Sequence, residues 1–352
     1  MATEKNNSND VIVRIEGRAG RLTLNRPDAL NALSHNMALT IDAALLDWQT
    51  NNNVALVLID AKGDKAFCAG GDVAALYQQG KSNDFASGQQ FWRDEYRLNA
   101  LIGNYSKPYV AVMDGIAMGG GIGISAHGSH RIVTERSMLA MPECAIGLVP
   151  DVGGTHLLSQ APGLIGEYLA LTGERFNASD ALFAGFADYF VQSDQLTALK
   201  AVLCKTGDVG VIKESHQEPE PSVLAKNESG ISSAFEGETL DVVIEQLEQL
   251  EYDWARTALK KMSRSSPLSL LLAFELVRKA RSEPGAERAL VREFRFVSRV
   301  MEHGDFLEGV RAALIDKDRQ PKWKHESVAA VSQKEIKQFR EVAIGGDPVL
   351  HQ

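Results

Sequence analysis

Two continuous apolar runs, separated by a helical pattern, constrain the fold of this chain most. Residues 54–59 read Val-Ala-Leu-Val-Leu-Ile and residues 109–113 read Tyr-Val-Ala-Val-Met, without the alternation of a strand that has one wet face. Such runs are typical of parallel strands that are covered on both faces. Parallel strands need a crossover between them, and residues 89–102 carry apolar side chains at helical spacing. The sequence therefore predicts an α/β fold.

Flanking patterns extend this α/β core in both directions. Residues 11–15 and 21–24 alternate across a glycine turn and predict a β-hairpin. Residues 33–48 have helical spacing behind Ser34, which can cap the helix. Strand and helix patterns alternate again from residue 131 to residue 171.

The composition changes after the core and predicts a helical C-terminal part. Residues 205–238 are rich in Gly, Ser, Glu and Pro, which indicates a long connection. We therefore expect a core over residues 1–204, the connection, and a helical region over residues 239–352. The helices expected in that region cover residues 240–250, 255–262, 268–281 and 286–301.

The charge balance argues against nucleic acid and anionic membranes as partners. The 46 acidic and 37 basic residues give a net charge of -9, whereas both partners require a basic surface. No apolar run reaches the roughly 18 residues of a membrane span, and residues 1–10 lack the apolar core of a signal peptide. Cys68, Cys144 and Cys204 lack paired metal spacing and are interpreted as reduced thiols. We expect a cytoplasmic protein without a bound metal.

Two glycine clusters follow predicted strands and are candidates for binding an oxyanion. Phe67-Cys-Ala-Gly-Gly-Asp72 precedes a helical pattern with Asp72 at its N-cap, and Met118-Gly-Gly-Gly-Ile-Gly123 also opens a helix. Each cluster brings uncrowded N–H groups to the positive end of a helix dipole. Either cluster alone could instead only allow a strand to turn into a helix.

The second cluster also fits part of a dinucleotide-binding fingerprint. Gly121, Gly123 and Ala126 match G-x-G-x-x-A, and Glu143 lies 20 residues beyond Gly123. However, residues 114–118 separate the strand from the first glycine, whereas the fingerprint requires the turn at the strand end. This mismatch disfavours an oxidoreductase.

Three acids are candidates for the chemistry. Glu143 lies between apolar segments, so desolvation should raise its pKa as a general base or nucleophile requires. Asp151 precedes Val152-Gly-Gly-Thr155 and is either functional or a cap of the next helix. Glu95 shares a helical face with apolar residues, so it either pairs with a buried base or lines a site.

Four motifs resemble the enoyl-CoA hydratase/isomerase (crotonase) superfamily. They are Leu24-Asn-Arg-Pro27, Phe67-Cys-Ala-Gly-Gly-Asp72, Asp114-Gly-Ile-Ala-Met-Gly-Gly-Gly121 and Leu148-Val-Pro-Asp-Val-Gly-Gly154. The resemblance implies a crotonase-like spiral of ββα units that binds acyl-CoA thioesters. It also implies that the N–H groups of Gly71 and Gly120 hold the thioester oxygen.

The chain departs from the hydratases of that superfamily at two positions. Hydratases carry a glutamate where Gly123 stands and a glycine where Asp151 stands, so only Glu143 of their glutamate pair is present. Glu143 with Asp151 and Glu95 is instead similar to the 3-hydroxyisobutyryl-CoA hydrolase subfamily. The segment from Asp305 to Trp323, DFLEGVRAALIDKDRQPKW, extends this similarity to nearly the whole chain.

The resemblance implies hydrolysis of a short β-hydroxyacyl-CoA, with 3-hydroxyisobutyryl-CoA giving 3-hydroxyisobutyrate and CoA in valine breakdown. Glu143 would attack the thioester carbonyl or activate water, and Asp151 would orient the substrate. Glu95, Asp72 and Arg26 are further candidates for substrate contacts, with Arg26 expected at the CoA phosphates. No cofactor is expected beyond the CoA of the substrate.

Two alternatives remain open at this point. One is a crotonase-fold hydratase or isomerase, and the other is a catalytically silent CoA-binding protein. A homo-oligomer could form through the C-terminal helices, although these helices could instead fold back on their own core.

Overall fold

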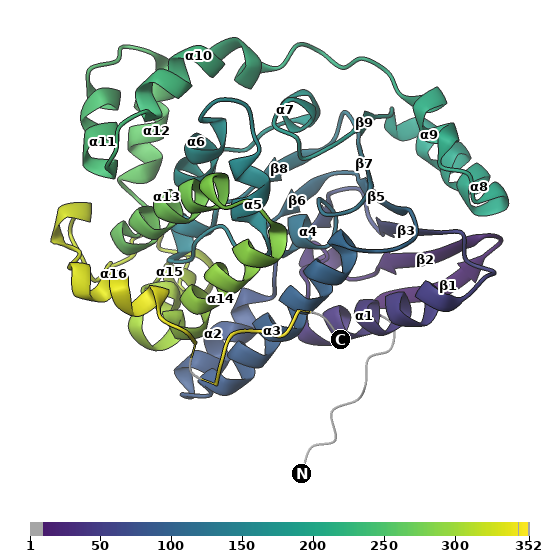
Figure 1. Cartoon of the computed structure of the whole chain (residues 1–352), viewed down its shortest axis with the longest axis horizontal. Helices are drawn as coiled ribbons and strands as arrows, with labels where there is room; N and C mark the ends of the chain where they lie inside the picture. The colour runs from purple at the N-terminus through teal and green to yellow at the C-terminus, as the bar shows by residue number, and fades with distance from the viewer. Residues whose placement is uncertain (1–9, 344, 351–352) are drawn as a thin grey trace.

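Two β-sheets form the centre of the computed structural model, which describes residues 10–343 and 345–350 (Figure 1). The larger sheet has the strand order β1-β2-β3-β5-β7-β9, and the smaller one has the order β4-β6-β8. The strands are β1 (Val11–Glu16), β2 (Ala19–Leu24), β3 (Leu56–Ala61), β4 (Ala66–Cys68), β5 (Tyr109–Met113), β6 (Ile116–Met118), β7 (His130–Val133), β8 (Met138–Ala140) and β9 (Tyr189–Phe190).

The chain moves between the two sheets in a regular alternation. Among the described strands, only β1 and β2 pair antiparallel, as the hairpin pattern predicted, and all later neighbours pair parallel. From β3 onward each odd-numbered strand joins the larger sheet and each even-numbered strand joins the smaller one. Successive strand pairs therefore advance as a spiral, which confirms the α/β prediction.

Helices link the strands and cover the sheets. Ser34 caps α1 by accepting the Met37 N–H at 3.3 Å, and Asp72 caps α2 by accepting the Ala75 N–H at 3.3 Å, as predicted. The helices of the core are α1 (His35–Thr50), α2 (Val73–Lys81), α3 (Phe85–Gly103), α4 (Gly120–Gly123), α5 (Gly154–Ser159), α6 (Ile165–Thr172) and α7 (Ala178–Phe183).

The segment predicted as a long connection contains helices. Following α8 (Leu196–Thr206), this segment includes α9 (Gly210–Ser215) and α10 (Val223–Phe235). Ser222 caps α10, which buries the apolar residues Leu224, Ile231 and Phe235 at helical spacing. Burial of this face outweighs the Gly- and Ser-rich composition on which the prediction relied. Only residues 216–222 run between α9 and α10 without regular structure (Figure 1).

The C-terminal helices pack directly on the core. They are α11 (Leu240–Glu248), α12 (Asp253–Met262), α13 (Pro267–Ser282), α14 (Ala286–His303), α15 (Phe306–Val310) and α16 (Gln333–Arg340). Helix α13 packs on α5 and α6, while α14 packs on α3 and α5 (Figure 1). In the described part of the chain, none of the helices is long and apolar enough to cross a bilayer.

Candidate active site

The two glycine clusters meet at the ends of β4 and β6. Gly120 is the first residue of α4, so its N–H has no acceptor within the helix. A Cβ atom at Gly120 would lie 3.1 Å from the Gly71 nitrogen and 2.8 Å from Glu95 Oε1. A Cβ atom at Gly119, where φ is +46°, would lie 2.8 Å from Glu143 Oε1. The glycines therefore allow two backbone segments and two carboxylates to approach closely.

The three predicted acids are buried around this junction. Glu143 begins a 3-10 turn directly after β8, Glu95 lies on α3, and Asp151 precedes α5. Their exposed fractions are 5%, 2% and 6%. Tyr96 donates a hydrogen bond from its hydroxyl to Asp151 Oδ2 at 2.8 Å. Asp151 does not cap α5 through its side chain, because Gly153 is the N-cap residue and has no side chain.

Burial and mutual repulsion shift the pKa values of these acids upward. Desolvation raises the pKa of Glu143 and that of Glu95 well above their usual range, and the charge of Asp151 raises both further. Desolvation also raises the pKa of Asp151 to about 7, although the Tyr96 hydrogen bond acts in the opposite direction. Burial therefore favours the protonated form of each of these carboxyls, a condition typical of acid–base sites.

Several polar atoms in this region have no partner within the described residues. They are Glu95 Oε1, Glu143 Oε2, and both the Nδ2 and the Oδ1 of Asn99. Asn99 lies one helical turn beyond Glu95 on α3. Buried polar groups are almost always satisfied, so a group of orphans around the glycines indicates a site for a polar ligand.

Comparison with known proteins identifies the family of this site. A family profile described as "Enoyl-CoA hydratase/isomerase" matches residues 19–339. The chain belongs to the enoyl-CoA hydratase/isomerase family. The "3-hydroxyisobutyryl-CoA hydrolase, mitochondrial" of Xenopus laevis is 43% identical over 328 residues, which cover 90% of this chain and 85% of that protein. The human protein of the same name is 37% identical over 96% of this chain and 89% of its own length.

Solved structures of this family carry different activities in their descriptions. An enoyl-CoA hydratase from Rhodobacter sphaeroides 2.4.1 is 47% identical, with a TM-score of 0.92 over 97% of this chain and 99% of that chain. A carnitinyl-CoA dehydratase from Mycobacterium thermoresistibile is 40% identical, with a TM-score of 0.92 over 96% and 98%. These values confirm the crotonase fold.

Gly123 lies where the hydratases of the family were expected to carry a second glutamate. A Cβ atom at this position would lie 2.7 Å from the Val152 Cβ and 2.8 Å from the Asn99 Nδ2. Side chains from α3 and from the Asp151 turn thus occupy the space that a glutamate would need. Only Glu143 of the expected hydratase pair is available.

Arg26 and Asp72 lie together at the start of α2. The Arg26 guanidinium donates to Asp72 Oδ2 at 3.2 Å and to the Ala32 carbonyl at 2.8 Å, and its Nε lies 3.8 Å from Asp10 Oδ2. Two carboxylates therefore already compensate the cation that was predicted to meet the CoA phosphates.

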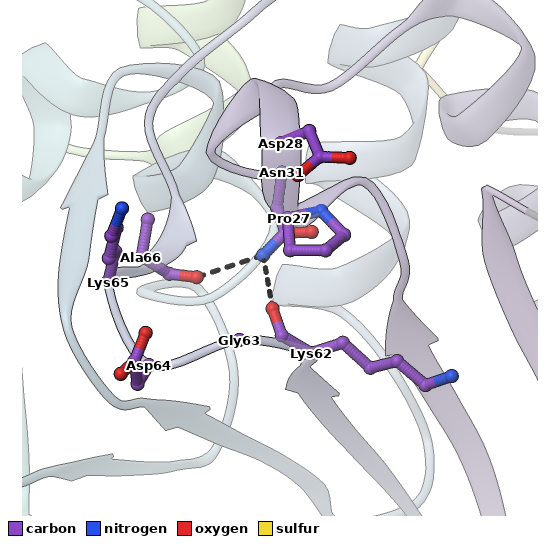
Figure 2. Close-up of a pocket in the computed structure, with 8 residues that line it drawn as sticks. All are labelled: Pro27, Asp28, Asn31, Lys62, Gly63, Asp64, Lys65 and Ala66. Atoms are coloured by element: carbon purple, nitrogen blue, oxygen red, sulfur yellow. Dashed lines mark hydrogen bonds between the residues drawn. The ribbon is translucent and has the colours of Figure 1, made fainter.

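A neighbouring pocket of about 210 Å³ contains two further cations together with two carboxylates, those of Asp28 and Asp64. Lys62 and Lys65 line it, and the strand that leads from it, β4, ends next to the glycine cluster at Gly70. Asn31 fixes the shape of this loop by donating to the carbonyls of Lys62 at 3.0 Å and Ala66 at 2.9 Å (Figure 2).

Three residues that the sequence analysis did not identify belong to the site. Tyr96 and Asn99 follow Glu95 on α3. Asn99 lies four residues after Glu95 and therefore on the same helical face, a signal that the sequence contains, whereas Tyr96 is the next residue and has no such spacing. Glu293 lies on α14 and binds the turn after Asp151, 140 residues away from Gly153. No local pattern marks such a contact.

Proposed function

We propose that this chain hydrolyses 3-hydroxyisobutyryl-CoA to 3-hydroxyisobutyrate and CoA, a reaction of valine breakdown. Relatives at about 40% identity over most of the chain carry that activity in their names. The observation that carries the proposal is the combination of buried Glu143 and Asp151 with a filled space at Gly123. A hydratase would need a second glutamate to position water for addition to a double bond.

The proposed reaction uses the glycine junction as an oxyanion hole. The N–H groups of Gly71 and Gly120 stabilise the negative charge that develops on the thioester oxygen. Glu143 acts in one of two ways: its carboxylate oxygen attacks and forms an anhydride that water cleaves, or it takes a proton from a water whose oxygen attacks. In both routes the C–S bond breaks, the sulfur leaves and is protonated, and one water oxygen enters the acid product.

The remaining polar groups are proposed to bind the hydroxyacyl end. A substrate hydroxyl can donate to Glu95 Oε1 or pair with the Asn99 amide, which would satisfy atoms that are orphaned without it. Asp151, held by the Tyr96 hydroxyl, exchanges a proton near neutral pH because burial raises its pKa to about 7. It is therefore suited to orient the substrate and to protonate a leaving group.

Other parts of the proposal concern partners and compartment. Lys62 and Lys65 are proposed to meet the CoA phosphates in place of Arg26. No cofactor is proposed, because an oxyanion hole and a carboxylate suffice for thioester hydrolysis. The cytoplasmic location stays a prediction. The vertebrate relatives, by contrast, are named as mitochondrial. Homo-oligomer formation also stays a prediction.

Thiol release from a panel of acyl-CoAs tests the function. We expect fastest release from 3-hydroxyisobutyryl-CoA, slower release from 3-hydroxypropionyl-CoA, and little hydration of crotonyl-CoA run beside it. Glu143→Gln should lower turnover by on the order of 10² to 10⁴ while CoA still binds. Glu218→Gln, on a side chain that is 94% exposed, is the matched control. Efficient hydration, or CoA binding without thiol release, would exclude the hydrolase.

A further inference from the structure

One buried carboxylate from α14 holds the turn that follows Asp151. Glu293 is fully buried, and its oxygens accept hydrogen bonds from the backbone N–H of Gly153 at 2.7 Å and of Thr155 at 3.0 Å. The Thr155 hydroxyl donates a third hydrogen bond at 2.5 Å. The two N–H groups can only donate, and the carboxyl oxygens of Glu293 supply an acceptor to each of them. Glu293 thus serves as the cap that Gly153 cannot provide for α5.

The turn that Glu293 holds has an unfavourable backbone conformation. Val152 has φ of +54°, a left-handed value that a β-branched residue rarely adopts, and Gly153 has φ of +79°. The Val152 carbonyl is also fixed by His127 Nε2 at 2.7 Å. Such strain costs about 1–3 kcal/mol and persists only where surrounding contacts enforce it. Asp151 is the residue directly before this strained position, so its direction depends on the same contacts.

A glutamate at this place on α14 has no other evident purpose in the structure. Its neighbours on the helix, including Leu290, Phe294 and Val297, form part of the apolar core. Burying a carboxylate among them is costly unless hydrogen bonds compensate it. Burial raises the pKa of Glu293 to about 8, while Thr155 and Gly153 counteract this effect. An apolar residue would fill the same space but would leave the N–H groups of Gly153 and Thr155 without this acceptor.

We propose that Glu293 is a positioning residue: it holds the turn from Asp151 to Thr155 in the conformation that aims Asp151 at Tyr96 and at the substrate, without touching the substrate itself. The inference rests on the proposed function for the role of Asp151. It assigns to the C-terminal helical region a direct part in shaping the site of the core.

Glu293→Gln tests the inference with little change in size. The amide has one acceptor oxygen, so its NH₂ group must face the N–H of either Gly153 or Thr155. We expect kcat for 3-hydroxyisobutyryl-CoA to fall on the order of 10²-fold, as for a small misplacement of a reacting group, with KM changed less than about threefold. A fall in kcat with a nearly unchanged KM would separate misplacement of a reacting group from loss of substrate binding.

Two further variants keep the test decisive. Glu302→Gln changes an exposed carboxylate on the same helix and should leave both kcat and KM unchanged. If Glu293→Gln does not fold, Thr155→Val removes only the hydroxyl donor and should still lower kcat several-fold in folded protein.

The outcomes separate this inference from the proposed function. A folded Glu293→Gln variant with wild-type kcat overturns the positioning role, as does a kcat loss that only follows the unfolded fraction. If Glu293→Gln does not fold and Thr155→Val is measured instead, a wild-type kcat in Thr155→Val also overturns the positioning role. A wild-type protein that releases no thiol overturns the proposed function instead.

Discussion

Burial raises the pKa of the Asp151 carboxyl from its usual value to about 7 in the folded protein. The unfolded chain has no such burial and gives up the same proton near pH 4. A folded-state pKa above the unfolded one contributes stability that is complete below about pH 4 and is lost as the pH rises through about 7. The same sign holds for Glu293, whose pKa is raised to about 8. The site should therefore reduce the stability of the fold most at neutral and alkaline pH.

Asp151→Asn should remove its share of this pH dependence. The amide oxygen can still accept the Tyr96 hydrogen bond, but no charge has to be buried. We expect the free energy of unfolding at pH 8 to exceed that of wild type by on the order of 1–4 kcal/mol, with a smaller difference at pH 5. Urea unfolding at both pH values measures it, with the exposed Asp241→Asn as control. A difference that does not grow with pH would contradict the argument.

At the scale of elements, the beginning of α4 depends on the absence of a side chain. We predict that Gly120→Ala lowers kcat/KM by about 10²-fold, because its methyl group lies between the Gly71 nitrogen and Glu95 and obstructs the oxyanion hole. The Glu95 tip can move aside, so a folded variant is expected. Steady-state kinetics and a thermal melt of the same sample check this.

The control substitution has to be sterically neutral. Gly63, on the loop before β4, is unsuitable because its φ is +90° and its Cβ would lie 3.1 Å from Pro27. Gly230 in α10 has ordinary helical φ and its Cβ would lie 3.5 Å from Trp254, so Gly230→Ala should keep normal kinetics. If Gly120→Ala only lowers the melting temperature and the folded fraction stays fully active, the glycines serve the turn alone.

Elements with a local signal were predicted well from the sequence. The strand at residues 109–113 was predicted at its observed bounds, and α13 and α14 differ from their predicted ranges by two residues or fewer at each end. Their apolar periodicity is contained in the segment itself. The glycine clusters were recognised because each of them also lies within one short segment of the sequence. By contrast, the contact of Glu293 with the Asp151 turn joins residues 140 positions apart, and no periodicity encodes it.

The whole molecule is built so that its helical region completes the core. One hydrophobic cluster runs from Val11 on β1 to Leu350 near the C-terminus. The helical region also packs against the 3-10 turn that begins at Glu143, because a Cβ at Gly309 of α15 would lie 2.3 Å from the Ile146 carbonyl oxygen of that turn. Asp305 anchors this segment by accepting the Ser266 hydroxyl at 2.6 Å. The C-terminal region therefore braces the turns of both catalytic candidates, which a separately folding domain would not do.

This arrangement predicts a single unfolding transition for the whole chain, because separating the two regions would expose their shared apolar core. The four tryptophans divide evenly, with Trp48 and Trp92 in the core and Trp254 and Trp323 in the helical region. Trp92 also packs edge-on against Phe306 of α15 at 6.0 Å between ring centroids.

In a variant with Trp254 and Trp323 replaced by Phe, urea midpoints from fluorescence and far-UV circular dichroism should coincide. The complementary variant, with Trp48 and Trp92 replaced, should give the same agreement at its own midpoint. Because the two signals are compared within one variant, a general loss of stability does not affect the result. A fluorescence transition separated from the dichroism transition would show that the helical region unfolds on its own.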